Sequence, residues 1–315
     1  MAQSITGQAL RKHKAIFLLA LCCCFLPFMN APFALLLGAL VAQCIPHPFA
    51  QIQAKVTQYL LQVSVVCIGF GMNAVAAFEV GKEGFVFAFV SICSTLLLGL
   101  LLGKWLKIDR ITSYLISAGT AICGGSAIAT LAPVTKANER QLSVALGTIF
   151  LLNTVALFVF PVIGHALHLT QHQFGLWSAI AIHDTSSVVG AATKYGNEAL
   201  QIATTVKLSR ALWIVPVALL TATTFKTGER QVKLPYFILL FIIAMVLNTY
   251  VPAIHIAAPF FVQLGKWGLV LTLFFIGTSL SKQALQVIGW KALLQGVLLW
   301  VFISVLALLG IMFLS

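Results

Sequence analysis

The sequence predicts an all-α membrane protein that crosses a lipid bilayer many times. Of its 315 residues, 60% are hydrophobic and only 8% are charged, whereas a soluble domain has about 25% charged residues. The apolar runs are long and continuous, unlike the alternating strands of a membrane β-barrel. Because the hydrocarbon core offers backbone groups no outside partner, helices are the spanning elements that these runs predict.

Eleven apolar segments follow one another along the chain, and each predicts one spanning helix. A span needs about 20 apolar residues, so the first two segments, which are shorter and joined by Asn30-Ala31-Pro32, predict a tight hairpin. No loop is long enough for a soluble catalytic domain, and residues 1–315 are therefore expected to form a single integral membrane transporter domain. The segments are 15–29, 32–46, 56–78, 84–106, 111–133, 140–164, 175–193, 199–225, 235–252, 258–281 and 290–314.

Basic residues between these segments predict how the chain is oriented. The net charge is +12. With the N-terminus in the cytoplasm, twelve Lys and Arg residues lie in cytoplasmic segments and four in outer loops, which agrees with the positive-inside rule. Because these residues are scattered among short loops and not gathered with aromatic side chains, no nucleic-acid partner is expected.

The seven cysteines and the histidines predict neither a metal site nor a cofactor. The cysteines form no C-x-x-C pair and lie mostly inside apolar runs, so we expect small buried side chains rather than zinc ligands or disulfides. His165, His168 and His172 have the spacing of one helix face, and we expect them at the membrane interface rather than around a metal ion.

Two pairs of similar segments indicate an internal repeat. Val66 to Phe85 resembles Leu273 to Leu293, and Ala121 to Ala129 resembles Ala181 to Val189. Duplicated halves with two interrupted spans are typical of secondary transporters. Chance similarity between apolar stretches is the alternative.

The stretch Gly119–Ser126 predicts that one span is interrupted. Three glycines occur within seven residues, and each weakens a helix by about 1 kcal/mol relative to Ala. A helix that restarts at Gly124 and Gly125 presents free N–H groups and the positive end of its dipole, with Ser126 in position to cap it. Such an end binds anions. The alternative is close helix packing through small residues.

The stretch His183 to Ser187 predicts a second interruption. Asp184 is an acidic residue well inside an apolar run, where a charge costs about 2.5–3.5 kcal/mol on insertion scales. Such acids mark ion or proton paths, and Asp184, Thr185 or Ser186 is also suited to cap a half-helix. We expect Asp184 to couple transport to an ion, with His183 either titrating beside it or donating a structural hydrogen bond. Thr185, Ser186 and Ser187 are candidate solute contacts.

Two basic residues within an apolar run complete the candidate site. Lys207 and Arg210 are three residues apart and share one helix face. Pointing inward, they would pair with Asp184 or attract an anion, which Arg can hold with two hydrogen bonds. Pointing outward, they would extend to the membrane surface. Asn153 is expected to form a hydrogen bond between helices.

These motifs resemble the YeiH-like family of bacterial membrane proteins described as sulfate exporters. The residues that carry the resemblance are ICGGSAIATLAPVTKA at 122–137, HDTSSVVGAA at 183–192 and KLSRALWIVP at 207–216. The resemblance implies an inner-membrane protein of about eleven spans. It also implies a distant similarity to sodium/bile-acid symporters and sodium/proton antiporters, whose fold has inverted repeats and two crossing discontinuous helices. One interruption would then fall at Gly124–Ser126 and the other at His183–Ser187.

Together these observations predict a secondary transporter of a small anion, such as sulfate, sulfite or an organic sulfonate. Coupling to protons or sodium is expected, and the other expected partners are the lipid bilayer and a second copy in a homodimer. A cation/proton antiporter and a non-transporting membrane protein remain as alternatives. Because no nucleophile–base or metal-ligand pattern occurs, an enzyme is not expected.

Overall fold

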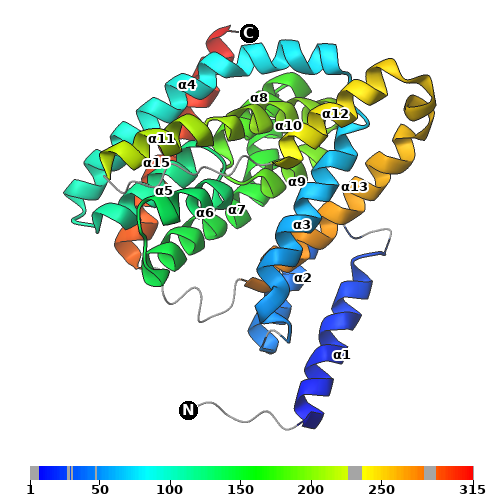
Figure 1. The fold of residues 1–315 in the computed structure, drawn as a ribbon, viewed down its shortest axis with the longest axis horizontal. Coiled ribbons are helices and arrows are strands. Elements are labelled where there is room, and N and C mark those ends of the chain that lie inside the picture. The colour runs from blue at the N-terminus through cyan, green and yellow to red at the C-terminus, as the bar shows by residue number, and fades with distance from the viewer. Residues whose placement is uncertain are drawn as a thin grey trace. The chain divides into compact units, whose positions relative to one another are not determined.

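Helices make up all the regular structure in the described part of the chain. A computed structural model describes residues 7–26, 29, 31–46, 48–225, 236–279 and 289–314, and every regular element within these ranges is an α-helix (Figure 1). This confirms the all-α prediction. The helices are α1 Gly7–Cys23, α2 Ala31–Cys44, α3 Ala50–Gly69, α4 Ala74–Trp105, α5 Arg110–Ala121, α6 Gly125–Val134, α7 Glu139–Ala166, α8 Gln171–Ala181, α9 Thr185–Tyr195, α10 Asn197–Leu212, α11 Ile214–Thr224, α12 Tyr236–Tyr250, α13 Pro252–Ser279 and α15 Trp290–Leu314.

Every predicted span contains helix, and the described residues include five helical stretches long and apolar enough to cross a membrane. These are Ala88–Trp105, Arg140–Ala166, Asn197–Thr224, Pro252–Ser279 and Trp290–Phe313. The stretch at 197–224 is divided at Trp213 into two helices, and Pro216 lacks the N–H that would bond to the Leu212 carbonyl. The multi-pass prediction therefore has direct support from helix length and composition.

The predicted boundary between the third and fourth spans is wrong. The sequence suggested spans at 56–78 and 84–106, but α3 ends at Gly69 and α4 begins at Ala74. Asn73 starts the new helix, because its side chain accepts hydrogen bonds from the amides of Val75 (2.9 Å) and Ala76 (3.2 Å). The polar residues around 79–83, expected in an outer loop, consequently lie within α4.

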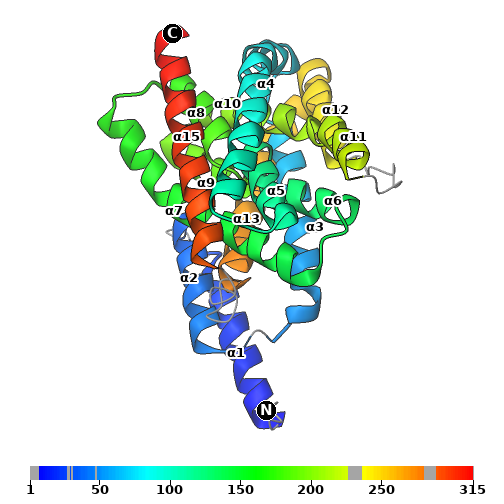
Figure 2. The same ribbon diagram turned by 90° about the vertical axis from the view of Figure 1, so that its left-hand side faces the viewer.

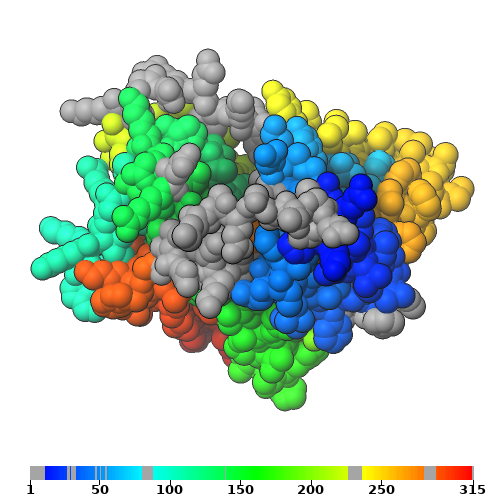
Figure 3. All heavy atoms as spheres, turned by 90° about the horizontal axis from the view of Figure 1, so that it is seen from below, coloured from blue at the N-terminus to red at the C-terminus, as the bar shows by residue number. Residues whose placement is uncertain are grey.

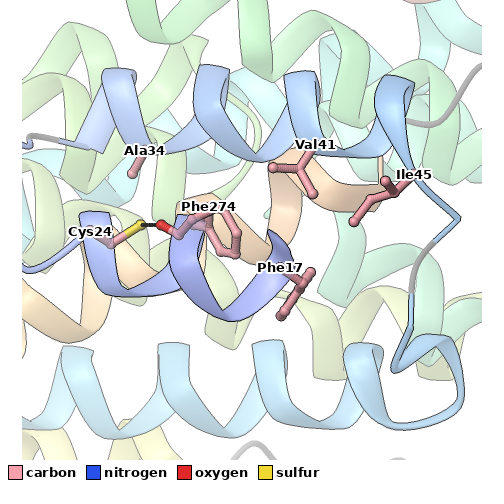
Figure 4. Close-up of a cluster of buried hydrophobic side chains, with 7 residues drawn as sticks. Phe17, Cys24, Ala34, Val41, Ile45 and Phe274 are labelled. Atoms are coloured by element: carbon pink, nitrogen blue, oxygen red, sulfur yellow. Dashed lines mark hydrogen bonds between the residues drawn. The ribbon is translucent and has the colours of Figure 1, made fainter. Parts of the chain in front are cut away.

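Packing divides the chain into two compact units. The first unit contains residues 1–71 and 239–285, in which α13 packs against α2 and α3. Gly38 and Gly277 let α2 and α13 approach closely, since a Cβ on Gly277 would lie 2.8 Å from the amide of Ala39. A buried cluster joins α1, α2 and α13, where the rings of Phe17 and Phe274 are 5.5 Å apart (Figure 4).

The second unit contains residues 72–238 and 286–315, and it holds both predicted interruptions. Within it α8 packs against α10, α5 against α4 and α7, and α15 against α4, α5, α7 and α8 (Figure 2). In the space-filling view, the orange atoms at the start of α15 lie beside the blue-green atoms where α4 leads into α5 (Figure 3). Gln295 on α15 joins these helices, because its buried amide donates to Ser113 Oγ (2.8 Å) and to the Gly99 carbonyl (3.1 Å). The prediction of one transporter domain for the whole chain stays a prediction.

Candidate functional site

Two helices of the second unit are interrupted at the predicted positions. The helix α5 ends at Ala121 and α6 starts at Gly125, which leaves a linker at 122–124. In the same way α8 ends at Ala181 and α9 starts at Thr185, which leaves a linker at 182–184. The two motifs that resemble each other in sequence thus form the same local structure, a half-helix, a three-residue linker and a second half-helix.

The two linkers touch at Gly124 and Asp184. Gly124 has φ +64° and ψ −124°, a conformation that side chains with a Cβ rarely adopt. A Cβ at this position would lie 3.3 Å from the Cα, the Cβ and the amide nitrogen of Asp184. The backbone conformation therefore favours glycine at 124, and a side chain there would also press against Asp184.

The half-helix α6 begins with an uncapped N-terminus. Its N-cap, Gly124, offers no side chain, and the hydroxyl of Ser126 donates backward to the Cys123 carbonyl at 3.0 Å. The prediction that Ser126 caps α6 is therefore wrong, because its hydroxyl finds a nearer acceptor in the linker. Gly125 is half-buried and Ser126 is exposed, so the positive end of α6 is accessible.

The half-helix α9 begins with a carboxylate cap. Asp184 accepts hydrogen bonds from the Ser186 amide, at 3.0 Å, and from the Ser186 hydroxyl. This confirms that Asp184 starts α9. Thr185 and Ser187 are buried beside it. The two N-termini thus differ, since the start of α9 already holds a carboxylate and the start of α6 does not.

Lys207 and Arg210 point inward from α10 and are fully buried. The ammonium group of Lys207 donates to the Ile182 carbonyl (2.7 Å) and the Ala179 carbonyl (3.3 Å). The guanidinium of Arg210 donates to the Ile180 carbonyl (3.3 Å) and to the Ala121 carbonyl.

These acceptors lie at the C-terminal ends of α8 and α5, where the helix dipole is negative. Within the described part of the chain, neither Lys207 nor Arg210 pairs with Asp184. Inward orientation is thus confirmed, while the expected pairing with the carboxylate is replaced by bonds to carbonyl groups.

Asn153 on α7 is a site residue whose role the sequence did not predict. Its Oδ1 accepts hydrogen bonds from the amides of His183 (3.1 Å) and Asp184 (3.2 Å). These are amides of an extended linker that has no helical partner for them, and burial makes a partner necessary. A lone Asn in an apolar span was the available signal, and it predicted only a hydrogen bond between helices.

The three histidines at 165, 168 and 172 do not share one helix face. The helix α7 ends at Ala166, so His168 lies in the connection to α8 and His172 in α8. His165 instead stacks on Tyr195, with ring centroids 4.3 Å apart. Among the described residues, no group of three side chains is arranged to hold a metal ion.

The contact between the two linkers, called the crossing below, brings together most of the predicted site residues. It combines two buried basic side chains, one buried carboxylate and one open helix N-terminus. This arrangement can attract a small anion, and it keeps an acidic group within the same structure. The predicted residues that meet here are Gly124, Gly125, Ser126, His183, Asp184, Thr185, Ser186, Lys207 and Arg210, and Ser187 follows one residue later in α9.

Comparisons with known proteins identify relatives across almost the whole chain. A family model described as conserved hypothetical protein 698 matches residues 15–296. A UPF0324 membrane protein of Bacteroides thetaiotaomicron is 53% identical, over 91% of this chain and 87% of that protein. A UPF0324 membrane protein of Shewanella oneidensis is 45% identical, over 98% of each chain. Their names state a membrane location and no solute, so the sulfate-exporter name has no counterpart in them. No solved structure matches the chain.

Proposed function

We propose that this chain, which belongs to the conserved hypothetical protein 698 family together with the UPF0324 membrane proteins, is a secondary transporter of a small anion. The observation that carries the proposal is the contact between the linkers of two interrupted helices. One linker leads to the open N-terminus of α6, and the buried side chains of Lys207 and Arg210 bond to carbonyls at or next to the linkers. Irregular backbone at membrane depth is tolerated where it is buried in protein or lines a cavity. Half-helix ends form the substrate sites of many secondary transporters.

The charge of the crossing favours an anionic solute. Lys207 and Arg210 supply two buried basic groups that donate to backbone carbonyls, whereas Asp184 supplies one acidic group that accepts from Ser186. The first amides of α6 add the positive end of a helix dipole without a side-chain cap. We therefore propose that the solute binds at Gly125 and Ser126, within reach of Thr185–Ser187. Sulfate, sulfite and organic sulfonates are the first candidates, because the sequence motifs resemble those of proteins described as sulfate exporters.

Coupling is assigned to Asp184 and His183, with a proton or sodium as the coupling ion. In the alternative of a cation/proton antiporter, Asp184 and Lys207 exchange partners with the transported ion. Lys207 instead donates to Ile182 and Ala179, which favours the anion transporter. We further propose the bacterial inner membrane as location, with a cytoplasmic N-terminus and no enzymatic activity.

The test is counterflow of labelled sulfate, sulfite and methanesulfonate into liposomes that contain the purified protein. Saturable counterflow of at least one anion is expected, and it should be lost in Asp184→Asn and in Arg210→Gln. Arg140→Gln is the matched control, because Arg140 is exposed at the start of α7. Flux that follows a sodium gradient and ignores all three anions would support the antiporter instead.

A further inference from the structure

We infer that the helix crossing contains a second, fully buried anion position, formed by Asn153, His183 and Arg210 on the inner side of the linker at 182–184. The inference rests on the proposed function only in taking the solute to be an anion. It differs from the accessible position at the start of α6, because its three residues are at most 3% exposed.

The first observation is a set of buried polar atoms without hydrogen-bond partners. Within the described residues, Asn153 Nδ2, Arg210 Nε and both ring nitrogens of His183 have no partner. The hydroxyl of Thr120, on the last turn of α5, has none either. Buried polar groups are almost always paired in proteins, so several unpaired groups in one region call for an explanation.

The second observation is that the hydrogen bonds of Asn153 and Arg210 hold both side chains at the two linkers or at the half-helix ends beside them. Asn153 Oδ1 lies 3.1 Å from the His183 amide, so the Nδ2 of the same planar amide lies beside the linker. The guanidinium of Arg210 bonds to Ala121 and Ile180. Ala121 is the last residue of α5, and Ile180 precedes the last residue of α8, so both lie where a half-helix leads into a linker. Thr120 immediately precedes Ala121. The residues that carry the unpaired groups therefore lie on α5, α7, α10 and the linker at 182–184, and three of these elements are joined to the linkers by the bonds above or lead into them.

The third observation is the chemical type of the unused groups. An amide nitrogen and a guanidinium nitrogen can only donate, and a neutral imidazole donates at one of its two nitrogens. Donors therefore outnumber acceptors among these atoms. A ligand that only accepts hydrogen bonds, such as a halide or an oxyanion oxygen, suits this set better than a cation, which Lys207 and Arg210 would repel.

The two proposed anion positions differ in their access to the outside. The open N-terminus of α6 is accessible, while Asn153 and His183 are buried. An anion that passes between them would move past the carboxylate assigned to coupling. The buried position therefore corresponds to an occluded step of transport.

The test measures anion binding directly in the purified full-length protein. Sodium sulfate and sodium chloride are titrated against sodium gluconate at constant ionic strength, and the melting temperature is recorded, because a ligand that binds the native state raises it. Asn153→Asp keeps an oxygen that accepts from both linker amides and removes the Nδ2 donor. Asn138→Asp is its matched control, since Asn138 is an exposed N-cap on the same helix where Asp caps equally well.

A second variant covers the case in which Asn153→Asp folds poorly. His183→Leu removes two ring nitrogens that have no partner among the described residues, so the melting temperature without anion should not fall. The expected result is a saturable anion-dependent rise in the wild type and in Asn138→Asp, and an affinity at least tenfold weaker in Asn153→Asp and His183→Leu.

The inference is overturned if neither anion binds the wild type, which is the result expected when water alone satisfies these donors. It is also overturned if His183→Leu binds the anion as tightly as the wild type does. Binding is measured without any flux, so the two proposals fail separately. Anion binding that depends on His183 without transport by the wild type would contradict the proposed function alone. Anion transport with unchanged binding in His183→Leu would contradict the buried position alone.

Discussion

Gly124 lies against Asp184 at the crossing of the two interrupted helices, with only 3.3 Å between the Cα of Asp184 and the place that a Cβ on Gly124 would occupy. This contact connects the accessible end of α6 to the acidic residue that starts α9. Each linker consequently sets the position of the other, and a change in one is expected to affect both half-helices.

Gly124→Ala should disturb the crossing strongly. The new Cβ would meet Asp184 and would also impose a side chain on a backbone with φ +64°, a type of strain that costs about 1–3 kcal/mol. We expect a melting temperature several degrees lower and loss of anion counterflow. Gly289→Ala is the control, because a Cβ there would meet nothing within 4 Å. Equal stability and transport in the two variants would refute the contact.

The positions of the two interruptions could be predicted from sequence because the responsible residues are local. Gly124 and Gly125 weaken a helix by themselves, and Asp184 starts one by itself. The partners of Lys207, Arg210 and Asn153 could not be predicted in this way. Their acceptors and donors are backbone groups at Ile182, Ala121 and His183, respectively. Each of these lies at least 25 residues away, so only the packing of α5, α7, α8 and α10 determines which groups meet.

Single residues also explain what the sequence missed at helix boundaries. The start of α4 was predicted too late in the sequence. The prediction counted apolar residues, and such a count does not detect that Asn73 caps the helix. Likewise, Ser126 was expected as a cap from its residue type, but the linker offers it the carbonyl of Cys123. In both cases a local hydrogen bond between a side chain and the backbone decides the outcome.

Substitutions at Asp184 should separate its structural role from its coupling role. Asp184→Asn keeps a side-chain oxygen that can accept from the Ser186 amide, so stability should change little. Asp184→Ala removes the cap and should cost about 1 kcal/mol or somewhat more. Transport driven by a proton or sodium gradient is expected to disappear in both variants, because both lack the charge. Thermal unfolding and gradient-driven flux measure the two effects, and full coupling in Asp184→Asn would exclude the carboxylate as the coupling group.

Acid should weaken the start of α5 through Asp109, which lies in the connection after α4 and caps α5. Partial burial raises the pKa of Asp109, but hydrogen bonds from Thr112 and Gln141 outweigh it and hold the pKa below its ordinary value of 3.8. Because the folded-state pKa is the lower one, the stabilisation is present above pH 3.8 and is lost as the pH falls through the folded-state pKa. Melting temperatures of the wild type and of Asp109→Asn, measured from neutral pH downward, should converge at the acid end. A difference that stays constant with pH would contradict this role.

Arg210 was predicted as a solute contact, but we expect it also to contribute to the stability of the fold. Its guanidinium joins the ends of α5 and α8 through the carbonyls of Ala121 and Ile180. Arg210→Gln leaves buried carbonyls without a partner, and each such group costs about 1–3 kcal/mol. Arg210→Lys keeps the positive charge but lacks the planar fork that reaches two carbonyls at once. We therefore expect melting temperatures in the order wild type, Arg210→Lys, Arg210→Gln, with counterflow falling in parallel. If Arg210→Gln melted like the wild type and lost only transport, Arg210 would be a solute contact and not a connection between the half-helices.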